Sequence, residues 1–217
     1  DQFTFPLMYA QIAEDKRTDV VALDQELLRR SWYLNDLERE HPALIAGSRR
    51  QVDAFLAAVR PFEAGKPAAT DDAAGRAAVA AGRAYDGAAL DTAYFAMIKS
   101  FVDQYERAGR DVYFTFQPDA QVVRGYSGES VGVALKARRT APGKSPAALR
   151  RWLTPVDPAG FDFAHLTDGT VPLDRNATMV RSWYADTLAA RAQLLQEAGE
   201  TGQAQELAAQ AQALAGG

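Results

Sequence analysis

Three side chains near the N-terminus have the chemistry of a ligand-binding site. Asp24 ends a run of β-branched and apolar residues at 19–23 that has the character of a buried strand. Open α/β sheets place ligand-contacting groups at the carboxyl ends of their strands, which makes this carboxylate a candidate. Trp32 and Tyr33 follow, and such rings stack well on sugars. Structural roles are more common for these residue types, since an aspartate here can cap a helix and aromatic residues within a helix usually belong to the core.

Other kinds of site are not indicated by the sequence. The chain has 217 residues, two histidines and no cysteine. Neither His41 nor His165 has a second metal-ligating residue at ligand spacing, and no nucleophile motif or phosphate loop is present. We therefore expect no metal, no cofactor and no catalytic residue in this chain.

The charge of the chain argues against polyanionic partners. It contains 24 lysines and arginines and 28 acidic residues, a formal net charge of −4, so it has no global basic field to attract nucleic acid. We interpret its paired arginines as solvated charges among acidic neighbours. These pairs are Arg29-Arg30, Arg49-Arg50, Arg138-Arg139 and Arg150-Arg151. We expect no nucleic-acid partner.

Hydrophobic periodicity predicts the helices around the candidate residues. In the first helix, Phe5, Met8, Tyr9 and Ile12 recur at the spacing of one face, and Pro6 suits its first turn. A second helix follows residue 24, a third ends at residue 61, and a long fourth helix stops at residue 109.

Strands are expected between these helices. Besides the run that ends at residue 24, the segments 111–116 and 131–135 have the β-branched and aromatic character of strands. Because helices and strands alternate, we predict an α/β fold class: a small parallel sheet, flanked by helices in a three-layer arrangement.

Composition divides the chain further. Residues 63–89 are rich in alanine, glycine and aspartate, which predicts a flexible, exposed and partly helical insertion. The C-terminal part places small and apolar residues at the spacing of a tetratricopeptide-like helix pair, namely Leu188, Ala192, Leu195, Ala204, Ala208 and Ala211. A single pair needs a surface to pack on. We predict an α/β domain over 1–160 and a helical tail over 161–217 packed on it.

The N-terminal residues resemble the signature of a family of polytopic membrane proteins. The resemblance lies in Asp1–Gln11, Arg17–Val21 and Trp32–Leu34. In that family a Gly-Asp-Asn-Asp-Thr-Phe-Pro-Leu-Trp-Tyr motif opens the soluble part after a bundle of transmembrane helices. The family is related to the GT-C class of lipid-linked-sugar glycosyltransferases. Its animal members are regarded as protein O-mannosyltransferases, and many bacterial members have tetratricopeptide tails.

The chain departs from this motif at several positions. Phe3 stands in place of the second acidic residue and Met8 in place of the tryptophan. Any role that depends on a pair of motif carboxylates is therefore not expected here.

The resemblance implies a role and a location for this chain. It implies a soluble domain on the extracytoplasmic side of a cell membrane, joined to a membrane-embedded N-terminal part of the same protein. GT-C enzymes carry their catalytic carboxylate in the membrane part, so the chain itself is expected to be non-catalytic. It is expected to help bind an acceptor polypeptide or a glycan. The implied ligand residues are Asp1, Thr4, Asp24, Trp32 and Tyr33.

Two alternatives remain open. The chain could be a free-standing tetratricopeptide-type interaction module whose tail grips a partner peptide. It could also be a small α/β enzyme, although no glycine-rich phosphate loop follows a strand. Transmembrane segments encoded upstream of Asp1 would favour the membrane-protein interpretation over the interaction module.

Overall fold

The chain divides into two compact units. The computed structural model describes residues 4–115, 118–132, 134–157, 163–170 and 172–216. Residues Asp1–Arg110 with Asp119–Val122 form the N-terminal unit, and Asp111–Pro118 with Val123–Gly217 form the C-terminal unit. This division groups the strands with the C-terminal helices. The domain boundary expected at residue 160 stays a prediction.

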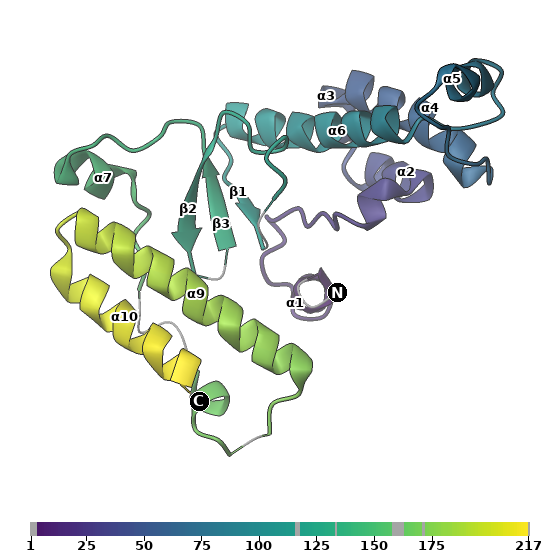
Figure 1. Ribbon diagram of the computed structural model, residues 1–217. Coiled ribbons are helices and arrows are strands. Elements are labelled where there is room, and N and C mark those ends of the chain that lie inside the picture. The colour runs from purple at the N-terminus through teal and green to yellow at the C-terminus, as the bar shows by residue number, and fades with distance from the viewer. Residues whose placement is uncertain (1–3, 116–117, 133, 158–162, 171, 217) are drawn as a thin grey trace. The chain divides into compact units, whose positions relative to one another are not determined.

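The N-terminal unit is helical (Figure 1). Its elements are α1 (Thr4–Ala13), the 3-10 turn η1 (Leu27–Arg29), α2 (Ser31–Glu40), α3 (Pro42–Gly47), α4 (Arg49–Glu63), α5 (Ala73–Ala80) and α6 (Gly87–Arg107). Helix α6 packs on α3 and α4, and α2 packs on the same pair. The core between them includes the rings of Phe55 and Tyr94, whose centroids lie 5.8 Å apart.

The strand predicted at 19–24 does not form. Residues 20–24 form no helix and pair with no strand in the part of the chain that the structure describes. Side chains take the carbonyl groups that a neighbouring strand would have used: Gln11 Nε2 donates to the carbonyl of Val20 at 2.7 Å, and Arg110 Nη2 donates to that of Asp19 at 2.6 Å. The carbonyl groups of Asp19 and Val20 are thus hydrogen-bonded without a sheet, and the predicted strand is absent.

The helix boundaries also differ from those predicted by the hydrophobic periodicity. The predicted third helix is divided at the buried Ser48 into α3 and α4, and α4 continues past Pro61 to Glu63. Pro61 lies in the last turn, so the hydrogen bond that it cannot donate is lost close to the end of the helix. The predicted apolar face of α1 is largely uncovered, since Met8, Tyr9 and Ile12 are 42%, 63% and 79% exposed.

The insertion at 63–89 connects two packed helices, α4 and α6. Its central part is α5, so the expectation of partial helicity is confirmed. Asp72 caps α5 by accepting from the N–H of Gly75 at 2.7 Å. On either side of α5, Ala68 and Tyr85 form an isolated parallel bridge.

The C-terminal unit combines helices with an antiparallel sheet (Figure 1). Its strands are β1 (Val112–Phe114), β2 (Ser127–Val131) and β3 (Ala134–Arg138), in the order β1-β3-β2, and its helices are α7 (Pro146–Trp152), α8 (Ala164–Thr167), α9 (Arg175–Glu197) and α10 (Thr201–Gly216). The mixed helix-and-strand class is confirmed. The parallel arrangement is wrong.

A short connection explains the antiparallel sheet. Val131 pairs with Ala134, so β2 and β3 form a tight hairpin, whereas parallel strands need a crossover of a dozen or more residues. Gly132, with φ 58°, supplies the left-handed backbone of the turn. The strand predicted at 131–135 is thus centred on this turn, and its residue 133 lies outside the described residues. The strand predicted at 111–116 contains β1, although residue 116 also lies outside them.

The two C-terminal helices form the predicted pair, and α9 also packs on β2. Their leucines, Leu188, Leu195, Leu207 and Leu214, belong to one buried cluster with Leu149 and Leu153. Gly199, with φ 81°, lies in the turn between the two helices. The tetratricopeptide identity of the pair stays a prediction.

Candidate functional site

Two of the predicted ligand residues, Asp24 and Tyr33, are in direct contact. Asp24 is buried, and its Oδ1 accepts from the N–H groups of Glu26 at 2.9 Å and Leu27 at 3.0 Å, at the start of η1. The Tyr33 hydroxyl accepts from the backbone N–H of Asp24 at 3.3 Å. Burial raises the pKa of this hydroxyl, although the hydrogen bond from Asp24 opposes the rise. The contacts are those of a capped turn.

The other predicted ligand residues are placed differently. Trp32 is 52% exposed, and its ring and the Tyr33 ring form a T-shaped pair with 5.8 Å between centroids. Its indole is therefore open to a ligand. Thr4 lies in α1, but its side chain and all of Asp1 are outside the described residues. The structure brings Asp24, Trp32 and Tyr33 together.

A buried ionic cluster in the C-terminal unit was not found from the sequence. Glu129 of β2 is 0% exposed and Arg191 of α9 is 2% exposed. Their Oε1 and Nη1 atoms lie 2.7 Å apart. Arg138 Nε donates to Glu129 Oε2, also at 2.7 Å, so two guanidinium groups surround one carboxylate.

Thr154 completes this cluster. Its N–H and its hydroxyl both donate to Glu129, and its carbonyl accepts from Arg191 Nη2. Burial alone would raise the pKa of Glu129, but the Thr154 N–H, Arg191 and Arg138 outweigh it and hold that pKa below its usual value. Because both carboxylate oxygens accept hydrogen bonds, the cluster acts as a clasp between α9, the sheet and the segment after α7.

One sequence signal could have indicated this clasp. Arg191 lies between Leu188, Ala192 and Leu195, on a stripe that is otherwise small or apolar. A charged residue on such a stripe requires a buried partner. The identity of that partner is not encoded locally, since Glu129 is 62 residues away.

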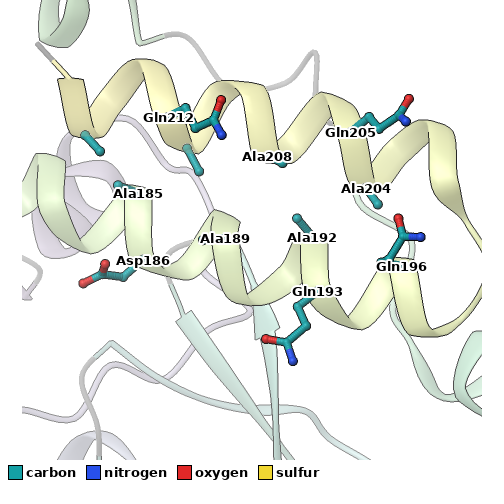
Figure 2. A pocket seen from close by; sticks show the side chains of 12 residues that line it. Ala185, Asp186, Ala189, Ala192, Gln193, Gln196, Ala204, Gln205, Ala208 and Gln212 are labelled. Atoms are coloured by element: carbon teal, nitrogen blue, oxygen red, sulfur yellow. The ribbon is translucent and has the colours of Figure 1, made fainter.

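A groove runs between α9 and α10. It has a volume of about 490 Å³. Its lining consists of alanines, glutamines and one aspartate: Ala185, Asp186, Ala189, Ala192, Gln193, Gln196, Ala204, Gln205, Ala208, Ala211, Gln212 and Ala215. Figure 2 shows alanine side chains between the two helices and glutamine side chains along them. Small residues let the helices approach closely and leave a shallow trough above them.

Comparisons with protein-family models, curated proteins and solved structures found no match.

Among the described residues, no three histidine or acidic side chains are grouped so as to hold a metal ion. The exposed His165 has only Asp168 nearby, with 3.8 Å between Nδ1 and Oδ2. No helix in the described part of the chain has the length and apolar character needed to cross a bilayer.

Proposed function

We propose that this chain is a non-catalytic polypeptide-binding domain whose binding surface is the groove between α9 and α10. The observation that carries the proposal is the composition of the groove, in which small side chains form the floor and amides form the walls. Alanines leave room for the side chains of a ligand. Asp186 is the one charged residue of the lining, so the groove itself selects little by charge.

The glutamines favour a polypeptide as the ligand. Each side-chain amide offers two N–H donors and an acceptor oxygen, which matches the alternating N–H and C=O groups of a peptide backbone. Gln193 and Gln196 come from α9, while Gln205 and Gln212 come from α10, so both helices present amides. A segment bound between them can form hydrogen bonds with both helices.

The clasp makes α9 a rigid support for this surface. Arg191 holds the helix to Glu129 and to the carbonyl groups of Ser130 and Thr154. Binding sites built on fixed elements lose less conformational freedom when a ligand binds.

The resemblance of the N-terminal residues suggests which polypeptide binds. We propose that it is the acceptor of a glycosyltransferase-like, membrane-embedded N-terminal part of the same protein, with this domain on the extracytoplasmic side. A free-standing interaction module would use the same groove for another partner. Several hydrophobic spans encoded before Asp1 would support the first role, and their absence would support the second.

The side of the membrane on which this domain lies can be tested directly. The chain has no cysteine, so an Ala190→Cys change introduces a single reporter on an exposed face of α9. In the full-length protein, with any other cysteines replaced, a membrane-impermeant maleimide should label this residue in intact cells. Labelling only after the cells are opened would contradict the extracytoplasmic location.

A matched pair of variants tests the groove. Ala189 and Ala190 are adjacent and exposed on α9, but only Ala189 lines the groove. Peptides are first selected from a random displayed library on the wild-type protein. Ala189→Arg should abolish their binding because its side chain fills the trough, whereas Ala190→Arg should leave binding unchanged. Equal loss in both variants, or no selected peptide, would refute the groove as the binding surface.

Trp32 carries a second candidate function, the binding of a glycan. Its exposed indole offers a face on which a sugar can stack. Titration with mannose-type glycans, followed by chemical shifts, should move the signals of Asp24, Trp32 and Tyr33, and Trp32→Ala should remove these shifts. Phe62→Ala, at another exposed aromatic residue, is the control. Unmoved signals at all three residues would exclude this candidate.

A further inference from the structure

One segment of the C-terminal unit is strongly basic in composition. Residues 123–156 contain seven lysines and arginines and one acidic residue, Glu129, which leaves a formal charge of +6. The whole chain carries −4, so its other residues together carry −10. The acidic neighbours expected around Arg138-Arg139 and Arg150-Arg151 are therefore scarce along this part of the sequence.

Part of this segment forms a region that we call the basic edge, in which two hydrogen bonds connect residues that are distant in the sequence. It comprises Arg124, Tyr126, Arg138, Arg139, Thr140, Lys144, Arg151 and Trp152. Arg139 Nη2 donates to the Tyr126 hydroxyl at 3.2 Å. The Trp152 indole N–H donates to the carbonyl of Thr140 at 2.7 Å, which ties α7 to the end of β3. Lys144 lies in the loop between them, and Arg124 precedes β2.

Several cations of this segment are used within the fold. Lys136 pairs with Asp111, Arg138 with Glu129, and Arg150 with Glu200. Arg124, Lys144 and Arg151 are exposed, and they form no ion pair with the residues that the structure describes. These three side chains are available to an anionic ligand.

The aromatic residues of the basic edge narrow the class of ligand. The guanidinium groups of Arg139 and Arg138 lie 5.6 Å from the ring centroids of Tyr126 and Trp152, respectively. One face of each ring thus already has a guanidinium over it, which leaves less aromatic surface for the bases of a single-stranded nucleic acid. Guanidinium groups also bind carboxylates in a matching planar geometry. A segment rich in aspartate and glutamate fits this chemistry.

The basic edge adjoins one end of the groove. Arg150 of α7 donates to the carbonyl of Ala198 at 3.0 Å and pairs with Glu200 at 2.6 Å, and both residues belong to the turn between α9 and α10. Gln196 and Gln205 line the groove next to this turn. We infer that the polypeptide bound in the groove carries an acidic stretch, which continues onto the basic edge; this inference rests on the proposed function.

Fluorescence anisotropy with labelled peptides tests the inference. The probes are a short poly-glutamate peptide and a poly-glutamine peptide of the same length. Poly-glutamate should bind the wild-type protein. Its affinity should fall as salt is added, because salt screens the charges on the surface. The triple variant Arg124→Gln, Lys144→Gln and Arg151→Gln should bind it about tenfold more weakly, as expected from three exposed ion pairs.

A charge-matched variant controls for the overall field of the protein. Arg60→Gln, Arg83→Gln and Arg107→Gln remove three exposed arginines from the N-terminal unit, and this change should leave poly-glutamate binding intact. Equal weakening in both triple variants, or equal binding of the two peptides, would overturn the inference. Binding of anionic phosphatidylglycerol vesicles without poly-glutamate binding would overturn it in favour of a lipid surface.

The experiments distinguish failure of the groove proposal from failure of the inference about the basic edge. The groove is tested by the effect of Ala189→Arg on the binding of the selected peptides, and this test does not use poly-glutamate. If only the groove proposal is wrong, poly-glutamate still binds through the three cations. If only the acidic stretch is wrong, the selected peptides still depend on Ala189, and poly-glutamate does not bind.

Discussion

Glu129 of β2 and Arg191 of α9 are 62 residues apart in the sequence, and they form an ion pair of 2.7 Å in which both side chains are buried. The pair joins the sheet to the helix that carries the groove. Arg138 and Thr154 saturate the carboxylate, so every oxygen of Glu129 has a partner.

Removing one partner should strongly destabilise the protein. Arg191→Leu leaves a buried carboxylate with one guanidinium fewer, and we expect the free energy of unfolding in urea to fall by about 3 kcal/mol. The double variant Glu129→Leu/Arg191→Leu should recover part of this loss, because neither charge remains buried. Arg49→Gln, which breaks exposed pairs with Glu38 and Asp53, should cost less than about 1 kcal/mol. A similar small cost for Arg191→Leu would contradict the clasp.

Acid should lower the folding stability of the wild-type protein by protonating Glu129. Its folded-state pKa lies below the usual value of 4.5, so the unfolded state takes up a proton first as the pH falls. The stability contributed by the ionised carboxylate is therefore present above pH 4.5 and is lost as the pH falls towards the folded-state pKa. Urea unfolding across this range should show a smaller pH dependence for Glu129→Gln. An unchanged pH dependence would show that another group is responsible.

Alkali should lower the folding stability of the N-terminal unit through ionisation of Tyr94. Burial raises the pKa of its hydroxyl from 10.0 to about 12, although the charge of Arg29, whose guanidinium lies 4.1 Å from the ring centroid, opposes the rise. The stability is present below pH 10.0 and is lost as the pH rises towards about 12, since the unfolded state ionises first. Tyr94→Phe should flatten this dependence and should also lose about 1 kcal/mol at neutral pH, through the hydrogen bond to the Gln25 carbonyl. Tyrosinate absorbance during the titration measures the ionisation directly.

Two helical glycines should respond oppositely to alanine. A Cβ atom at Gly75 in α5 would lie 1.9 Å from the backbone carbonyl oxygen of Thr70, so Gly75→Ala should destabilise the insertion between α4 and α6. A Cβ atom at Gly202 in α10 meets nothing within 4 Å, and Gly202→Ala should stabilise the protein by about 1 kcal/mol through helix propensity. Thermal unfolding compares the two variants. Stabilisation by Gly75→Ala would show that the turn before α5 can move away.

Local patterns predicted the helices better than the sheet. The periodicity at 90–105 lies within α6, and the spacing of small residues at 188–211 is that of the α9–α10 pair. The run at 19–24 was misinterpreted because its carbonyl groups are taken by Gln11 and Arg110, and Arg110 is 91 residues from Asp19. A strand is defined by its neighbour, which hydrophobicity alone does not reveal.

The candidate site divides in the same way. Asp24 and Tyr33 were identified by residue type, and the structure gives them the roles of a cap and its support. The α9–α10 groove and the basic edge depend on which faces remain uncovered after packing. Exposure of that kind is a property of the folded chain.

The sequence by itself determined the α9–α10 pair, the absence of cysteine and the concentration of positive charge at 123–156, because composition and short-range spacing are local properties. Only the tertiary structure decided the antiparallel order of the strands, the partner of Arg191 and the side of the helix pair that stays open. Each of these depends on contacts between residues far apart in the chain, and such contacts form only when the hydrophobic core brings distant segments together.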